Sequence, residues 1–258
     1  MEGTAGLLQF ERQAWASGCK RVAGVDEAGR GPLAGPVVAA AVVIAQTFIE
    51  QEEHRLFDAL TDSKQLTANQ RDRFFELLVN SPEVEIGIGF GYVPEIDEIN
   101  ILCATHRSMN RCLHHLAALP EYALVDGLPV PNLPCPSLAI IKGDARSLSI
   151  AAASVIAKVT RDRWMTDLDR RHPEYGFGRH KGYGTAAHIQ ALLKYGAITQ
   201  HRRSFRPVRD IEAIRGRMQH AVTLNQNSKF QAPNSNEPQS NKTKRTKRME
   251  KLDLFWLH

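Results

Sequence analysis

The chain has 258 residues, of which 43% are apolar and 24% are charged, and its net charge is +5. These values are typical of a globular protein with a sizeable core, and they exclude a collagen-like chain, a wholly disordered chain and a disulfide scaffold. No apolar run approaches the roughly 18 residues of a membrane span, and the N-terminus lacks the basic and apolar regions of a secretory signal. Four widely spaced cysteines predict free thiols in a reducing cytoplasm and no zinc site: Cys19, Cys103, Cys112 and Cys135.

The first half of the chain alternates short helical and extended patterns. A short amphipathic helix is predicted over 5–17, followed by a strand over 22–25 and a buried, β-branched strand over 36–45. The pattern over 67–79 opens with a threonine cap and predicts a helix. A strand is predicted over 83–93. Its three glycines are spaced by two and therefore lie on one face of the strand, where another element is expected to pack closely.

The second half contains two short strands and three helices. Residues 99–119 are predicted to be helical, and 122–125 and 138–141 are short apolar strands. A long helix with an alanine-rich first half follows over 148–170, and another over 185–195. This order of elements predicts an α/β domain around a mixed sheet flanked by helices.

Charge and composition vary along the chain. Residues 1–141 carry 10 Lys and Arg against 18 Asp and Glu, whereas 142–209 carry 14 against 5. A basic segment joined to one rich in carboxylates suits a protein that binds a polyanion. Beyond 222 the chain becomes polar and basic, so we expect one domain over 1–222 and a disordered basic tail over 223–258.

A glycine-rich turn over 29–35 follows the first strand and has two interpretations. It is similar to a dinucleotide-binding turn, but such a turn opens a helix, and here Pro32 and Pro36 precede a run of strand formers. We therefore interpret it as a turn whose amide groups face a phosphate or a sugar at close range.

Acidic residues follow three of the predicted strands. Asp26 and Glu27 come after the first, Asp126 after the strand over 122–125, and Asp144 shortly after the strand over 138–141. Each could instead be a helix cap or a turn former. Carboxylates gathered at one sheet edge repel unless cations neutralise them, and oxygen ligands of this kind suit Mg²⁺ or Mn²⁺. Two such ions can catalyse phosphodiester hydrolysis.

Several motifs together resemble the ribonuclease HII family. They follow the family's order over about 20–208 and are the stretches 25–36, 62–66, 125–127, 142–144, 149–154, 180–185 and 201–205. The resemblance implies a ribonuclease H-like fold with a mixed five-stranded sheet. It also implies an endonuclease that cleaves RNA paired to DNA and incises 5′ of a single ribonucleotide embedded in duplex DNA, leaving 3′-hydroxyl and 5′-phosphate ends.

The resemblance also assigns roles to individual residues. Asp26, Glu27, Asp126 and Asp144 map onto the family's site for two Mn²⁺ or Mg²⁺ ions. The turn formed by Gly29, Arg30 and Gly31 maps, with Tyr183, onto the element that reads the ribose 2′-hydroxyl, the group that distinguishes RNA from DNA. Substrate or phosphate contacts are expected from six basic residues, each of which could also be an ordinary surface charge: Lys64, Lys142, Lys158, Lys181, Arg202 and Arg203.

The last residues of the tail turn apolar again. Leu252, Leu254 and Phe255 form a peptide similar to the one that binds bacterial sliding clamps, with Lys251 where glutamine is usual. Docking on a clamp and packing back on the protein's own domain are both consistent with this pattern. The basic run before it could raise affinity for nucleic acid or simply aid solubility.

Three other functions remain open on the sequence alone. A ribonuclease HIII usually has an additional N-terminal domain, and only about 20 residues precede Arg21. A junction resolvase would lack the turn that reads ribose, and a non-catalytic hybrid-binding protein has no reason to gather acids near phosphates. We expect a cytoplasmic, monomeric enzyme that acts on RNA/DNA hybrids and on duplex DNA containing ribonucleotides, with no membrane partner.

Overall fold

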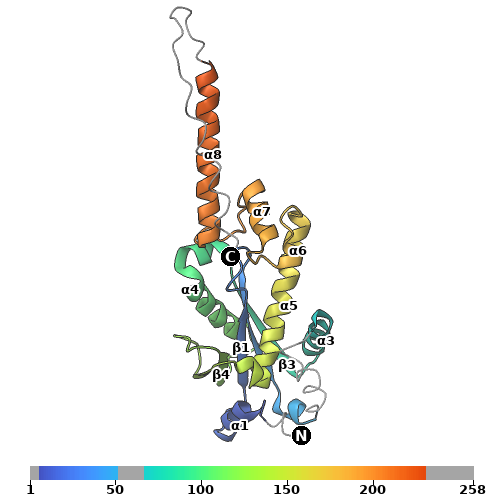
Figure 1. Ribbon diagram of the computed structural model, residues 1–258. Coiled ribbons are helices and arrows are strands. Elements are labelled where there is room, and N and C mark those ends of the chain that lie inside the picture. The colour runs from blue at the N-terminus through green and yellow to red at the C-terminus, as the bar shows by residue number, and fades with distance from the viewer. Residues whose placement is uncertain (1–5, 52–66, 231–258) are drawn as a thin grey trace, which may run out of the picture. The chain divides into compact units, whose positions relative to one another are not determined.

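Figure 1 shows a computed structural model, which describes residues 6–51 and 67–230. The chain divides into two compact units after Gly216, a few residues before the predicted boundary at 222. The first unit contains every element discussed below except the second half of the last helix. No helix within the described ranges is both long enough and apolar enough to cross a bilayer.

A mixed sheet of five strands forms the centre of the first unit. The strands have the order β3-β2-β1-β4-β5 and are β1 (Val22–Ala28), β2 (Val37–Ile44), β3 (Val84–Gly91), β4 (Tyr122–Asp126) and β5 (Ser137–Ile140). β1, β2 and β3 pair antiparallel, whereas β1, β4 and β5 pair parallel. The carboxyl ends of β1, β4 and β5 therefore lie side by side at one edge of the sheet.

Helices cover both faces of the sheet (Figure 1). The helices of the described residues are α1 (Gln9–Ala16), α3 (Ala68–Val79), α4 (Val93–His114), α5 (Leu148–Arg171), α6 (Phe177–His180), α7 (Ala186–Tyr195) and α8 (Arg206–Phe230), of which α4 packs on one face of the sheet and α3 and α5 pack on the other. β2 is buried along its whole length because alternate residues face two different cores. Ala40 and Val42 pack with α3 and α5, while Ala39 and Ala41 pack with α4.

The glycines of β3 explain how α4 comes so close to the sheet. A Cβ atom on Gly87 would lie 2.0 Å from the carbonyl oxygen of Cys112, and one on Gly89 would lie 2.0 Å from that of Ser108. Any larger residue would push the helix off the strand. The predicted close packing on the glycine face is thereby confirmed.

The boundaries differ from the prediction at several places. β1 continues through Asp26 and Glu27, which were expected to follow it, because its pairing with β2 extends to Ala28. α4 begins before the predicted start and bends at Asn100 (φ 68°, ψ 165°), whose Oδ1 accepts the N–H groups of Leu102 and Cys103 and so caps the second segment of the helix.

Two helices were not predicted. α6 is a single turn, and α8 runs through the expected start of the disordered tail to Phe230, so 223–230 are helical. The helix therefore covers the first eight residues of the segment that was expected to be disordered. The backbone groups of a helix bond to one another, which requires no buried apolar surface. The rest of the tail, 231–258, lies outside the described residues.

Candidate active site

The four acidic residues predicted as metal ligands lie at one end of the sheet, at or just after the carboxyl ends of three strands. Asp26 and Glu27 lie on β1, Asp126 is the last residue of β4, and Asp144 lies in the 3-10 turn η1 (Gly143–Ala145) that follows β5. β1 and β4 run parallel and in register up to the residue before each acid. Asp26 and Asp126 therefore lie at the same level on neighbouring strands.

Asp26 is the most enclosed of these acids, with 6% of its surface exposed. Its Oδ1 accepts the N–H of Glu27 at 2.7 Å, and the hydroxyl of Ser154 on α5 donates to its carboxylate. Glu27 points to the opposite face of the sheet, as the next residue of a strand must. There its Oε1 lies 3.2 Å from Nη1 of Arg30.

Asp126 links the strand ends to the η1 turn. Its Oδ1 accepts the N–H of Gly143 at 2.6 Å, and Gly143 is the residue immediately before Asp144. This hydrogen bond holds the end of β4 against the turn after β5. The two carboxylates are thereby brought close together.

The charges of these acids raise the pKa values of Asp26, Glu27 and Asp126. Burial raises the pKa of Asp26 well above its usual value, and the charges of Glu27 and Asp126 raise it further. Burial also raises the pKa of Glu27, which Arg30 partly opposes and Asp126 reinforces. The pKa of Asp126 is raised by burial and by the charge of Asp144. Asp126 thus interacts with each of the other three carboxylates.

The donor set fits a hard divalent cation, although it does not form a complete ligand shell. Carboxylate oxygens are the ligands that Mg²⁺ and Mn²⁺ prefer, and a cation would relieve the repulsion that raises these pKa values. Within the ranges that the structure describes, no three His, Cys, Asp or Glu side chains converge closely enough to hold one ion. Binding therefore requires side-chain rearrangement, and the ion pair between Glu27 and Arg30 is one contact that would have to open.

The glycine-rich turn and Tyr183 lie next to each other beside these acids. Gly29 has a φ of +97°, and a Cβ atom there would lie 2.0 Å from Nε of Arg161, so only glycine is accommodated. A Cβ atom on Gly31 would contact the ring of Tyr183 at 3.5 Å. The Tyr183 side chain is 46% exposed. The turn therefore presents an open backbone surface bordered by an aromatic ring.

Comparisons with known proteins show the family to which the chain belongs. The model of the family described as Ribonuclease HII matches residues 23–208. The chain belongs to the ribonuclease HII family. A Ribonuclease HII of Geobacillus kaustophilus is 52% identical over 205 residues, which are 80% of this chain and 75% of that protein. Like other members, the chain is a ribonuclease H, an endoribonuclease for RNA/DNA hybrids.

Solved structures show the same fold. The ribonuclease H2 of Pyrococcus horikoshii is 32% identical with a TM-score of 0.61, and the match covers 75% of this chain and 97% of that one. The ribonuclease HII of Archaeoglobus fulgidus, solved as a complex with PCNA, is 25% identical with a TM-score of 0.58, and the match covers 72% of this chain and 95% of that one. The expected ribonuclease H-like sheet flanked by helices is confirmed.

One predicted phosphate contact of this ribonuclease HII is wrong. Arg202 is fully buried, and its guanidinium donates to the carbonyl oxygens of Gly35 (3.0 Å), Arg30 (2.9 Å) and Gly29 (2.6 Å). All three nitrogens are engaged with the backbone of the glycine-rich turn. A phosphate cannot reach this side chain, because the carbonyl groups that it holds surround it.

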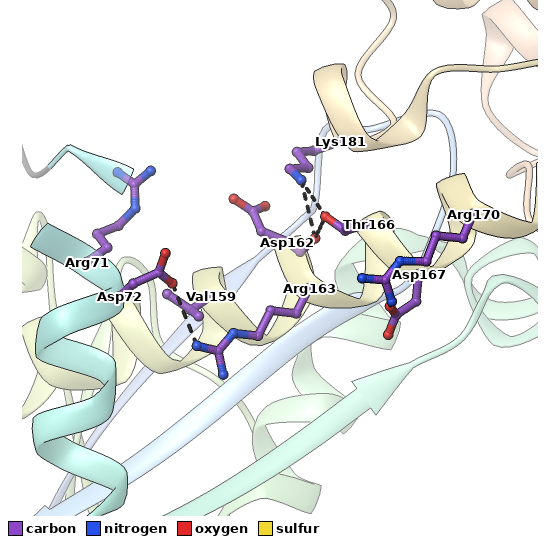
Figure 2. Close-up of a pocket in the computed structure, with 9 residues that line it drawn as sticks. All are labelled: Arg71, Asp72, Val159, Asp162, Arg163, Thr166, Asp167, Arg170 and Lys181. Carbon is purple, nitrogen blue, oxygen red and sulfur yellow. Dashed lines mark hydrogen bonds and ion pairs between the residues drawn. The ribbon is translucent and has the colours of Figure 1, made fainter. Parts of the chain in front are cut away.

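The other predicted phosphate contacts keep some exposed surface. Lys158 pairs with Asp162 at 2.8 Å, and Lys142 is exposed with a φ of 57°. Nζ of Lys181 donates to Oγ1 of Thr166 at 2.8 Å, at the edge of a groove between α3 and α5 (Figure 2). Arg203 is mostly exposed and lies 3.5 Å from Glu212. A role for these four in binding phosphate stays a prediction.

Other predicted site residues lie outside the described part of the chain. These are Lys64, which was expected to contact substrate, and the clamp-binding residues Leu252, Leu254 and Phe255.

Sequence reasoning missed the buried polar groups beneath the turn. Arg161 is 1% exposed and donates to three carbonyl oxygens, those of Ala34, Pro36 and Lys181. Its position four residues after Ala157 and four before Met165, both buried, continues the apolar stripe of α5, and this periodicity was the signal available. Nothing in the sequence distinguishes Arg202 from the exposed Arg203.

Two buried histidines form a second polar group that sequence reasoning missed. Nε2 of His188 and Nε2 of His201 are 3.0 Å apart, and both side chains are fully buried. Burial lowers the pKa of His188 to about 4, and burial together with His188 lowers that of His201 to about 3. Both imidazoles are therefore neutral at pH 7.

We expect this histidine pair to make folding stability depend on pH. The unfolded histidines take up protons below about pH 6.5, whereas the folded ones stay neutral down to about pH 4. The free energy of unfolding should therefore fall as the pH drops through this window, with each unit of pKa difference worth about 1.4 kcal/mol. Denaturant titrations at pH 7 and pH 4.5 measure the change.

The control for this prediction is the double variant His188→Gln, His201→Gln. Acidic groups with raised pKa values act in the opposite direction, so the relevant quantity is the difference between the pH slopes of the two proteins. The variant should lose less stability on acidification than the wild type. Equal slopes would show that the pair does not couple folding to protons in this window.

Proposed function

We propose that this ribonuclease HII incises 5′ of a single ribonucleotide embedded in duplex DNA, in addition to cleaving RNA/DNA hybrids, and that it uses two divalent cations. The observation that carries the proposal is the position of the glycine-rich turn and Tyr183 beside the four carboxylates. A reader of one sugar next to a hydrolytic site is what incision at one ribonucleotide requires.

Asp26, Glu27, Asp126 and Asp144 would hold the cations, which when bound activate water and stabilise the leaving oxygen of the scissile phosphodiester. Ser154 orients the carboxylate of Asp26, and the N–H of Gly143 orients that of Asp126. The exposed Arg30 is placed to neutralise phosphate charge once Glu27 turns toward a cation. The products would carry 3′-hydroxyl and 5′-phosphate ends.

The ribose is selected by groups that cannot adapt to a deoxyribose. Backbone amides of the turn over 29–31 are fixed donors, and a 2′-hydroxyl is both donor and acceptor. The ring of Tyr183 can stack on the next sugar and exclude a second 2′-hydroxyl by shape. Together these contacts would favour the junction of one ribonucleotide with a following deoxynucleotide.

Cation binding is tested with Asp26→Asn. Removing a buried, repelled charge should raise the free energy of unfolding in chelator by about 0.5–2 kcal/mol, as stabilising replacements at strained sites often do. Mg²⁺ or Mn²⁺ should raise the melting temperature of the wild type but not of the variant, because a ligand stabilises only the state that binds it. The variant should cut a duplex with one ribonucleotide at least about a hundredfold more slowly, since even residues that only support metal ligands account for 10–100-fold.

A wild-type protein whose melting temperature and activity were both indifferent to chelator would contradict the two-cation proposal. Asp162→Asn is the matched control, because Asp162 lies on α5 and pairs with Lys158 away from the acids. It should keep the response of the melting temperature to cations.

Tyr183→Ala tests the sugar reader. Because the ring is half exposed and makes no side-chain hydrogen bond to the domain among the contacts observed in the described residues, the variant should fold and bind cations normally. Its kcat/KM should fall about tenfold or more on a duplex with one ribonucleotide, in line with the about 1–3 kcal/mol of one aromatic stacking contact. Equal cutting of that duplex by variant and wild type would contradict the role given to Tyr183.

We also propose that the C-terminal peptide binds a sliding clamp. The complex of the A. fulgidus ribonuclease HII with PCNA supports an association of this kind, and Leu252, Leu254 and Phe255 supply apolar anchors. Deleting 251–258 should abolish capture of the enzyme by immobilised bacterial clamp and leave cleavage of a short duplex unchanged. Retention on the clamp after the deletion would exclude this peptide as the contact.

A further inference from the structure

The segment containing His201 and Arg202 contacts both parts of the proposed sugar reader. The N–H of Arg202 donates to the carbonyl of Leu33 at 2.8 Å, and the N–H of Gly35 donates to the carbonyl of Gln200 at 2.8 Å. Ala34 and His201 pair as an isolated antiparallel bridge. The segment therefore forms a short ladder with the second half of the glycine-rich turn.

The side chain of Arg202 forms hydrogen bonds to the first half of that turn as well. Its three hydrogen bonds reach the carbonyls of Gly29, Arg30 and Gly35, so the planar guanidinium spans the turn from one end to the other. No carboxylate forms an ion pair with Arg202 among the described residues. Burial lowers its pKa to about 9, which still leaves it charged at pH 7.

Arg161 adds a link to the loop that carries Tyr183. From α5 it donates to the carbonyls of Pro36 (2.9 Å) and Ala34 (3.1 Å) and also to that of Lys181 (3.0 Å), two residues before Tyr183. The N–H of Leu33 donates to the carbonyl of Gly182 at 2.8 Å. The turn and the loop are thus joined by backbone and side-chain contacts.

The side chain of His201 reaches the carbonyl of Tyr183 itself through His188. The N–H of Ile198 donates to Nδ1 of His201, so the proton of this imidazole must be on Nε2. That Nε2–H donates to Nε2 of His188, which leaves the proton of His188 on Nδ1, where it donates to the carbonyl of Tyr183 at 2.9 Å. Both tautomers are therefore determined by the network.

We propose that His201 and Arg202 are positioning residues that set the separation between the glycine-rich turn and Tyr183, and thereby the selectivity for a ribonucleotide followed by a deoxynucleotide. This inference rests on the proposed function, in which the turn contacts the 2′-hydroxyl and the ring stacks on the next sugar. One of these consecutive residues bonds to the carbonyls of the turn, and the other bonds through His188 to the carbonyl of Tyr183. A misplacement of about 1 Å at such a site can cost about 100-fold in rate.

A purely structural role makes a different prediction. If these residues only stabilised the fold, their variants would lose active enzyme and would slow every substrate by the same factor. If they position the readers, the ratio of kcat/KM for a single embedded ribonucleotide to kcat/KM for a uniform RNA/DNA hybrid will change. A hybrid offers a 2′-hydroxyl at every register and is less sensitive to the spacing.

The test uses two variants that act at the two ends of the segment. Arg202→Lys keeps the charge but cannot span three carbonyls with one ammonium group. His201→Phe keeps an aromatic ring beside Tyr175 and Phe177 but breaks the chain of hydrogen bonds to Tyr183. Arg206→Lys is the matched control, because Arg206 lies four residues after Arg202, its side chain is 76% exposed, and it pairs with Asp210 away from the turn. We expect both test variants to lower the kcat/KM ratio about tenfold and the control to leave it unchanged.

Hydrogen exchange supplies a readout that is independent of activity. Arg202→Lys should accelerate exchange of amides over 29–36, and His201→Phe that of amides over 182–184, while amides of β1 and β2 keep their protection. If Arg202→Lys does not fold, His201→Phe measures the same ratio and the same exchange. Proportional losses on both substrates, or unchanged exchange in both segments, would overturn the proposal.

Tyr183→Ala in the same assay separates this inference from the proposed function. A lower ratio for Tyr183→Ala with an unchanged ratio for both positioning variants would leave the sugar reader intact and overturn the role of His201 and Arg202. A wild-type enzyme that cleaves the hybrid but does not incise at a single ribonucleotide would remove the proposed function, and this inference would fall with it.

Discussion

Repulsion among four carboxylates is the constraint on which the rest of this structure depends. Asp126 interacts electrostatically with the other three, and the burial of Asp26 limits the screening of its charge by water. Such a cluster opposes folding, so favourable contacts around it must offset the repulsion. The parallel pairing of β1 with β4 and the hydrogen bonds from the Ser154 hydroxyl and the N–H of Gly143 are contacts of this kind.

The fold places two buried cations behind the glycine-rich turn and bonds them to carbonyl groups of the backbone. Arg161 and Arg202 use backbone carbonyls as acceptors, and their pKa values of about 10 and about 9 leave both charged at neutral pH. Had carboxylates been their partners, the positive charge would have been cancelled within the protein. Because carbonyl groups are neutral, they do not cancel the charge of either guanidinium, and a positive charge favours the approach of a phosphate backbone.

The sequence alone predicted the elements whose signals are local. The apolar run of β2 and the glycines of β3 indicate strands because burial and close packing leave a direct trace in residue type. The acids could be placed at one edge because parallel strands end together. The extension of β1 through Asp26 was missed because it depends on pairing with β2, which is a property of the folded chain.

The buried polar residues that support the site could not be predicted from the sequence, because their positions also depend on the folded chain. Arg202 and Arg203 are identical in type and adjacent, yet one is fully buried and the other mostly exposed, and only the tertiary position of the turn decides which. His188 and His201 are separated by 13 residues and meet only because α7 and the following loop return to the turn. Their role as neutral hydrogen-bonding partners has no counterpart in composition or periodicity.

A sugar reader made of backbone needs such a scaffold. Gly29 and Gly31 have no side chains with which to anchor the turn, and the conformational freedom that lets Gly29 adopt a φ of +97° also makes the turn easy to deform. The backbone carbonyl groups are the acceptors through which the protein can hold the turn, because the amide groups must stay free for the substrate. Arginine is suited to this task because one rigid fork can hold several carbonyls at once. Close approach of the nucleic acid thus requires glycine on the surface of the turn that faces the substrate. Because glycine cannot anchor the turn, long, buried polar side chains must hold its carbonyl groups from within the protein.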